Sequence, residues 1–291
     1  MRVSAAIMAE QIKANLARQS KQLMETQLKL ATGRRINKPS DDPTGTSKVL
    51  DYRTTLQAIG QYRRNIQDAG TRLTYTETVL EQVSELVEQA KKIGADPNMD
   101  NPTLFAREIG NIRQQIHGLA HSQYGASYLF AGNRSDTPPF DAAPPYAYHG
   151  DDGTHQVVVG KGVTVRIEAD GRRMFGDGDE SLFQLLHNLE TALSAEPVDP
   201  ATVRDLVDSL YGAADRLKLA RSALASDYQR LQKTDDHWNR FANSVESMRQ
   251  SVEDADITQA AIDMQVQQTA YEVLLATSAR VIQPTLVDFL R

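Results

Sequence analysis

Two histidines, His117 and His121, are the residues whose types and spacing come closest to a chemical site. They lie four positions apart in a segment with helical periodicity, so both side chains lie on one face and could bind a zinc ion together. The residues between them are Gly118, Leu119 and Ala120, and none of these can act as the general base of a metalloprotease. We therefore interpret the two histidines as structural and expect no metal.

Adjacent carboxylates occur at Asp41 and Asp42, directly before Pro43, a residue suited to the first turn of a helix. Neighbouring carboxylates could serve acid–base catalysis. Carboxylates just before a helix also cap its free backbone N–H groups and stabilise its positive end. We predict capping, by Ser40 or Asp41, and no catalysis. Residues 177–180 resemble part of a calcium loop, but their spacing does not match an EF-hand, and a solvated turn is predicted.

Other patterns typical of catalysis or ligand binding are absent from the sequence. There is no cysteine, which excludes thiolate metal sites and thiol catalysis. There is also no phosphate-binding glycine loop, no nucleophile elbow and no defensible Ser, His and Asp set. A basic cluster at Arg34, Arg35 and Lys38 lacks interleaved aromatic residues, and the net charge of the chain is -6, so nucleic-acid binding is not expected. We expect no catalytic residues, no cofactor and no enzymatic activity.

The strongest pattern is an apolar repeat near the end of the chain, with the alternating spacings of four and three that are typical of a coiled coil. It comprises Ile257, Ala261, Met264, Gln268, Tyr271, Leu275, Ser278 and Ile282, followed by Leu286. The same spacing occurs near the beginning of the chain, at Ile12, Leu16, Leu23 and Leu30.

The two repeats are predicted to pack against each other. Residues 1–40 hold eight Lys or Arg and two Glu, which gives a net charge of +6. Residues 250–291 hold six acidic residues and two Arg, which gives a net charge of -4. These opposite charges favour pairing of the two ends. A second apolar row at Val273, Leu274 and Val281 makes the C-terminal stripe wider than one neighbour can cover. We therefore predict that the apolar residues of both repeats also form an assembly interface between subunits.

Turn signals divide the rest of the chain into long helices and one insertion. Helical periodicity is predicted over residues 1–32, 44–93, 102–122, 182–193, 201–252 and 256–283. Residues 132–178 differ, since they hold eight of the 17 Gly and four of the 11 Pro. Within them, β-branched runs at 156–159 and 163–167 indicate a hairpin. Pro284 is expected to kink or end the last helix near Gln283.

The predicted fold is mainly α. It is a long antiparallel helical rod, a coiled-coil-like bundle formed by both chain ends, with a small β-rich domain inserted in the middle. The predicted domains are terminal assembly helices at 1–42 and 253–291, a helical rod domain at 43–131 and 180–252, and a β-rich inserted domain at 132–179.

Targeting signals are not apparent in the sequence. The residues after Met1 are polar and amphipathic, which does not match a signal peptide. No run approaches the ~18 to 20 apolar residues that a membrane span requires, so no membrane association is expected. These features alone predict a cytosolic protein, unless export uses a route without a cleaved signal.

Three ordered segments resemble the flagellin superfamily. The sequence ATGRRINKPSDDP at 31–43 resembles the turn that joins the first two helices of these proteins. SYLFAGN at 127–133, followed by TPPF, is similar to the entry into the variable domain of hook-associated members. VEDADI at 252–257 and the Gln- and Ala-rich segment after it are similar to the C-terminal assembly helix. The candidate residues of the turn motif are Arg35, Asn37, Asp41, Asp42 and Pro43.

The resemblance implies a structural adaptor of the bacterial flagellum that joins hook and filament. It also implies an extracellular location reached by type III flagellar export without a cleaved signal peptide, with an export chaperone bound before assembly. Copies would self-associate in a ring between the preceding hook-associated protein and flagellin. The ending VIQPTLVDFLR favours this junction role. The alternatives are a flagellin-type filament subunit and a free-standing coiled-coil translocator or adhesin of another secretion system.

Overall fold

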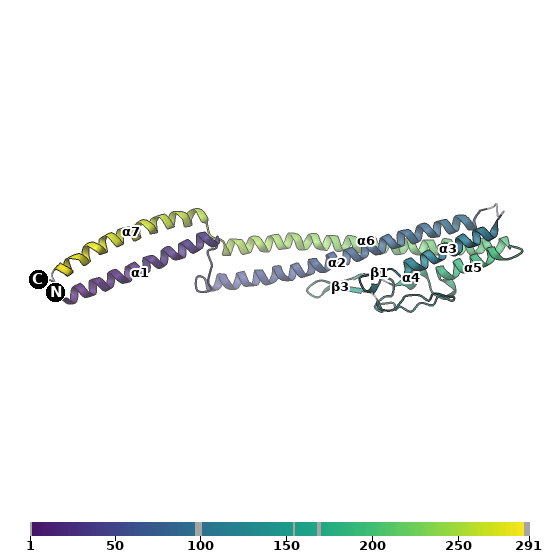
Figure 1. Ribbon diagram of the computed structural model, residues 1–291, viewed down its shortest axis with the longest axis horizontal. Coiled ribbons are helices and arrows are strands. Elements are labelled where there is room, and N and C mark those ends of the chain that lie inside the picture. The colour runs from purple at the N-terminus through teal and green to yellow at the C-terminus, as the bar shows by residue number, and fades with distance from the viewer. Residues whose placement is uncertain (1, 97–100, 154, 168–169, 288–291) are drawn as a thin grey trace. The chain divides into compact units, whose positions relative to one another are not determined.

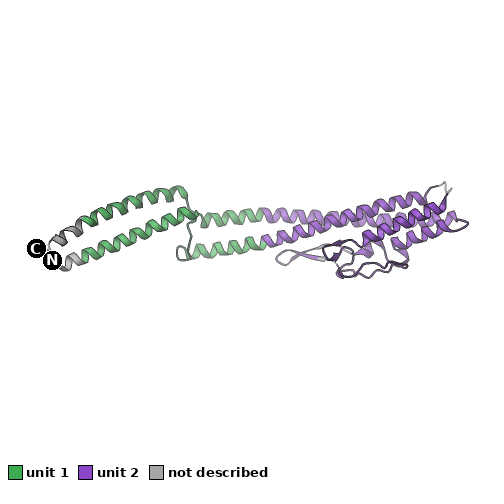
Figure 2. Ribbon diagram, in the orientation of Figure 1, with its two compact units in different colours: residues 1–58, 240–291 green, residues 59–239 purple. Residues whose placement is uncertain are grey.

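The computed structural model describes residues 2–96, 101–153, 155–167 and 170–287. These form two compact units (Figures 1 and 2), of which unit 1 contains residues 1–58 and 240–291 and unit 2 contains residues 59–239. The division falls within the two longest helices, α2 (Pro43–Gly94) and α6 (Pro200–Glu253), so each helix contributes to both units.

Unit 1 contains the two terminal helices, α1 (Arg2–Thr32) and α7 (Ile257–Val287), which lie side by side and run in opposite directions (Figure 1). The predicted pairing of long terminal helices is therefore confirmed. Pro284 was predicted to kink or end the helix near Gln283; it does not end there, because α7 continues through Pro284 to Val287. Proline removes a single backbone N–H from a helix, and the remaining hydrogen bonds of a long helix can still form around it.

In unit 2, the helices α2, α3 (Pro102–Ala120), α5 (Leu182–Ser194) and α6 share one hydrophobic core. Its fully buried side chains include Leu80, Val83, Val87, Ile109, Ile116, Leu189 and Leu210. α2 and α6 run antiparallel and are joined by ion pairs, from Arg221 to Glu77 at 2.7 Å and from Arg63 to Asp235 at 2.9 Å. The mainly helical prediction is confirmed.

Two short strand pairs lie between α3 and α4 (Gly171–Phe175). The predicted hairpin is confirmed: β3 (His155–Gly160) pairs with β4 (Val163–Ile167), and Gly162 takes a positive φ of 72° in the turn. The second pair, β1 (Gln123–Tyr124) with β2 (Ser127–Tyr128), and the helix α4 were not predicted. Strands of two residues and a helix of little more than one turn carry too little periodicity to be predicted from sequence.

The insertion is fixed to the helices by aromatic rings and by one tryptophan. Phe140 lies 4.8 Å from Phe183 of α5 and 5.6 Å from Phe175 of α4, measured between ring centroids. The indole N–H of Trp238, on α6, donates to the carbonyl oxygen of Val159 at 2.7 Å. Trp238 is the single tryptophan of the chain, so its fluorescence reports on unit 2.

Candidate assembly interface

One row of side chains on each helix forms the contact between α1 and α7. On α1 this row consists of the half-buried Ile12, Leu16, Leu23 and Leu30, together with the buried Thr26. On α7 it consists of Ala260, Met264, Gln267, Tyr271, Leu274 and Ser278. The structure thus brings all four of the candidate α1 residues to the partner helix. Polar members such as Thr26 and Gln267 make the contact weaker than a fully apolar seam.

The candidate residues of α7 divide between two faces. Met264 and Tyr271 face α1, whereas Ile257 and Leu275 are 49% and 43% exposed. A straight α-helix has 3.6 residues per turn, so a strict seven-residue repeat drifts around its surface by about 20° per heptad. The row that contacts α1 therefore includes Ala260 and Leu274, and not the predicted Ile257 and Leu275. The side chains of Ile282 and Leu286 lie outside the described residues.

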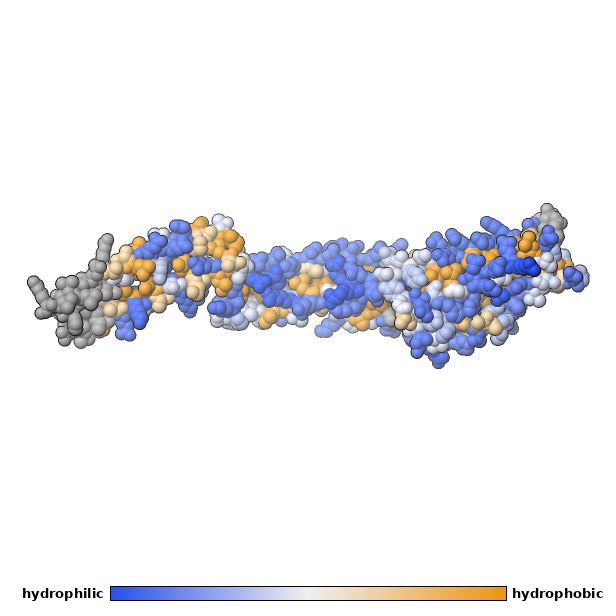
Figure 3. Space-filling model, viewed as in Figure 1, coloured by the Kyte–Doolittle hydropathy of each residue, from blue (hydrophilic) through white to orange (hydrophobic). Residues whose placement is uncertain are grey.

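A further apolar row lies on the face of α7 opposite the α1 contact. Its members Ile262, Val266 and Val273 are 55%, 63% and 59% exposed. α1 likewise exposes Ile7, Met24 and Leu28, and on the face in view apolar side chains gather over both helices (Figure 3). Ile262 and Val266 were not predicted from the sequence. Their spacing of four residues, and the seven residues from Val266 to Val273, are typical of one face of a helix. A single chain leaves this apolar surface uncovered.

Replacing Gln267 by Met is expected to stabilise the α1–α7 pair by about 1 kcal/mol. The side-chain Oε1 of Gln267 is buried without a hydrogen-bond partner among the described residues, and such an oxygen costs free energy in the folded state. Amide hydrogen exchange in residues 12–30 and 260–278 should slow by about fivefold. Gln265→Met, at an exposed position of the same helix, is the control and should leave exchange unchanged.

The turn between α1 and α2 is held by Asp41. Its Oδ2 accepts hydrogen bonds from the backbone N–H groups of Lys38 at 2.9 Å and Asn37 at 3.0 Å. These two bonds lower the pKa of Asp41 below its ordinary value, because they favour the charged carboxylate. The side chain of Asn37 donates in turn to the carbonyl oxygen of Arg34 at 2.9 Å.

Asp42 is the N-cap of α2, so the prediction of Ser40 or Asp41 as the cap is wrong. Pro43 is the first helical residue, and the residue directly before it therefore occupies the capping position. Asp42 Oδ1 accepts from the N–H of Gly45 at 2.8 Å, and this bond, followed by the contact with Arg35, lowers the pKa of Asp42. All five candidate residues of the turn motif lie in or beside this turn.

Backbone hydrogen bonds join the turn to the segment between α6 and α7. The N–H of Arg35 donates to the carbonyl oxygen of Glu253 at 2.7 Å, and the N–H of Ala255 donates to that of Gly33 at 2.9 Å. Arg34 and Asp254 form an isolated antiparallel bridge. The end of α1 and the start of α7 are therefore tied together, which fixes where their apolar rows meet.

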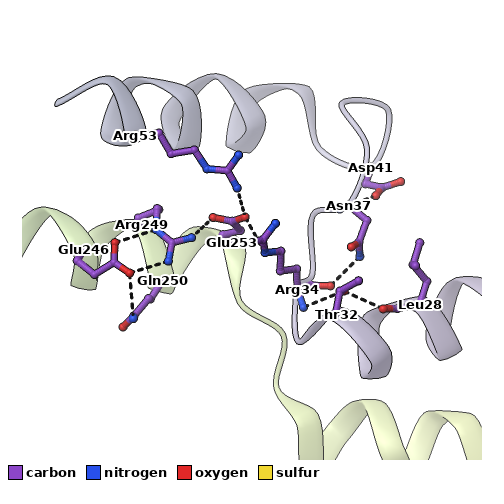
Figure 4. Close-up of polar contacts among 10 residues, drawn as sticks. All are labelled: Leu28, Thr32, Arg34, Asn37, Asp41, Arg53, Glu246, Arg249, Gln250 and Glu253. Carbon is purple, nitrogen blue, oxygen red and sulfur yellow. Dashed lines mark hydrogen bonds and ion pairs between the residues drawn. The ribbon is translucent and has the colours of Figure 1, made fainter. Parts of the chain in front are cut away.

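The carboxylate of Glu253 lies at the centre of this junction (Figure 4). Glu253 is only 2% exposed, and its Oε1 contacts Arg34 Nε at 3.1 Å and Arg53 at 2.5 Å, while its Oε2 pairs with Arg249. The pKa of Arg249 is raised first by Glu246 and then by Glu253. Sequence analysis missed this network, because Arg53 and Glu253 are separated by 200 positions and no local spacing relates them.

The two histidines hold the inserted segment against α3. His117 Nε2 lies 2.9 Å from the carbonyl oxygen of Asp141, and His121 Nε2 lies 3.0 Å from that of Phe140. Their ring nitrogens thus contact backbone oxygens of the insertion. Among the described residues, no group of three or more His, Cys, Asp or Glu side chains is placed to hold a metal ion.

Unit 2 is expected to lose stability as the pH falls below about 6.5. Burial lowers the pKa of His117, although the carbonyl oxygen of Asp141 acts in the opposite direction. The unfolded chain therefore binds a proton more readily than the folded one between the folded-state pKa and about 6.5. The contribution of neutral His117 to stability is therefore fully present above about pH 6.5 and is lost as the pH falls towards the folded-state pKa. Urea unfolding, followed by Trp238 fluorescence, gives the free energy of unfolding of unit 2 at pH 5 and at pH 7.5. The difference between these two free energies should be smaller for His117→Gln than for the wild type. An equal difference in both proteins would contradict this assignment.

Comparison with known proteins shows similarity to proteins of the bacterial flagellum. Residues 3–135 match the model of the bacterial flagellin N-terminal helical region. The chain is 29% identical over 211 residues to the flagellar hook-associated protein 3 of Salmonella typhimurium, covering 67% of this chain and 66% of that protein.

Solved structures with this fold include a putative flagellar hook-associated protein of Vibrio parahaemolyticus, with a TM-score of 0.69 and 22% identity over 74% of this chain and 100% of the other. The flagellar junction protein FlgL of Legionella pneumophila matches with a TM-score of 0.59 and 12% identity, over 71% and 99% of the two chains.

Paired terminal helices, the turn motif and these matches are those of a structural protein of the bacterial flagellum, and residues 3–135 are similar to the N-terminal helical region of flagellins. The proteins to which the chain is similar include the flagellar hook-associated proteins 3, also called FlgL. These are structural flagellar proteins and not enzymes. In the described part of the chain, none of the helices has the length and hydropathy needed to cross a membrane.

Proposed function

We propose that this chain joins the flagellar hook to the filament through coiled-coil packing of its N- and C-terminal helices. The observation that carries the proposal is the exposed apolar row of Ile262, Val266 and Val273 on α7, which lies opposite the face that α1 covers. Apolar rows on two faces allow a helix to contact neighbours on both sides.

The proposed partners follow from this position in the flagellum. Copies of the chain self-associate in a ring, which contacts the preceding hook-associated protein on one side and flagellin on the other. Before assembly, an export chaperone covers the apolar helices. The protein leaves the cell through the type III flagellar export apparatus, without a cleaved signal peptide, and its final location is extracellular.

Immunogold labelling of intact flagella tests the proposal. Label confined to one site between hook and filament is the expected result, and deletion of the gene should leave hooks that bear no filaments. Label along the whole filament would instead identify a flagellin-type subunit. Label absent from flagella altogether would support a free-standing coiled-coil protein of another secretion system.

A further inference from the structure

The junction in unit 1 contains a cleft of about 220 Å³ between the turn, the first three turns of α2 and the end of α6. Its apolar lining includes Ile36, Val49 and Leu50, and Leu50 is 55% exposed there. A cavity of ~150 Å³ can hold a benzene ring, so this cleft is large enough for a branched aliphatic side chain.

The polar lining of the cleft is cationic. Arg34, Lys38 and Arg53 line it together with Glu253, which leaves a formal excess of positive charge. Thr46 also lines the cleft, and its hydroxyl oxygen is buried without a hydrogen-bond partner among the described residues.

The same junction exposes a segment with complementary chemistry. Asp254, Asp256 and Ile257 are exposed, and Ile257 is 49% exposed. None of them lines the cleft of its own chain. The Arg34–Asp254 bridge and the hydrogen bond from Ala255 to Gly33 hold this segment in place.

We propose that the cleft binds the acidic segment 254–257 of a second copy, with Ile257 packed on Leu50 and Asp254 paired with Lys38. Both surfaces belong to the junction of unit 1, so identical copies repeated around a ring would present cleft and segment at the same level. A contact between two different surfaces of identical subunits is heterologous, and such contacts form a ring when the rotation between neighbouring copies closes. This inference rests on the proposed ring assembly.

Disulfide cross-linking between two variants tests the contact, because the natural chain has no cysteine. Leu50→Cys and Ile257→Cys are expressed together in one cell from separate tagged genes, and flagella are isolated and oxidised. A disulfide that joins the two tags can only connect different copies. The expected result is cross-linked dimer at least about fivefold above that of a control pair, Ile257→Cys with Leu219→Cys, whose leucine is 71% exposed in unit 2.

Charge reversal gives an independent readout in the same assay. Lys38→Glu and Asp254→Lys should each lower the yield of cross-linked dimer about fivefold. When every copy carries both substitutions, the yield should return to that of the original pair. Flagella that contain both tags but show no more cross-linking than the control would overturn the inference alone. Flagella that lack the protein would overturn the proposed function and the inference with it. Cross-linking of Leu50→Cys only to another flagellar protein would assign the cleft to that partner instead.

Discussion

Replacing Glu253 by Gln is expected to destabilise unit 1 by about 2–3 kcal/mol. The carboxylate is buried and pairs with Arg34, Arg53 and Arg249, and removing one partner of a buried pair leaves uncompensated charge. Loss of a buried partner costs ~3–5 kcal/mol in general, and the half-exposed side chains of Arg34 and Arg53 reduce this figure through solvent screening.

Hydrogen exchange and urea unfolding measure this effect. Exchange should accelerate in residues 28–36 and 250–258, where backbone hydrogen bonds join the turn to the α6–α7 segment. Trp238 fluorescence should show unchanged stability of unit 2. Glu246→Gln is the matched control, because Glu246 also pairs with Arg249 but is more exposed, with 39% side-chain exposure against 2% for Glu253. If both variants lost the same stability, the central role of Glu253 would be refuted.

Replacing Leu275 by Asp is expected to abolish incorporation into the flagellum while unit 2 remains folded. Leu275 is 43% exposed in the single chain, so the substitution removes little packing within the chain itself. In the proposed assembly the new carboxylate would be buried without a partner, which should weaken association at least about a hundredfold.

Electron microscopy of cells that carry only the Leu275→Asp variant gives the readout, with hooks lacking filaments as the expected result. Leu275→Met keeps the apolar surface and should support normal filaments. Trp238 fluorescence of the purified variant separates failed assembly from failed folding. Normal filaments on the Leu275→Asp cells would exclude Leu275 from the assembly interface.

Local sequence patterns were sufficient to predict the long helices, the β3–β4 hairpin and the pairing of the chain ends. Ile12, Leu16, Leu23 and Leu30 form a repeat that belongs to one helix, and their spacing alone defines the face that contacts α7. The β3–β4 hairpin is equally local, since two β-branched runs flank a glycine turn. The resemblance of three motifs to the flagellin superfamily agrees with the matched family and with the fold.

The tertiary structure decided which face of α7 packs inside the chain and which remains exposed. A repeat shows that a helix has an apolar row, but the partner helix selects the residues that it covers. Here these include the buried Ala260 and the half-buried Leu274, whereas Ile257 and Leu275 remain exposed. The Glu253 network and the cleft beside it were equally invisible, because their side chains come from segments about 200 positions apart. Periodicity reports interactions within a few turns of a helix, whereas contacts of this kind exist only once the chain has folded.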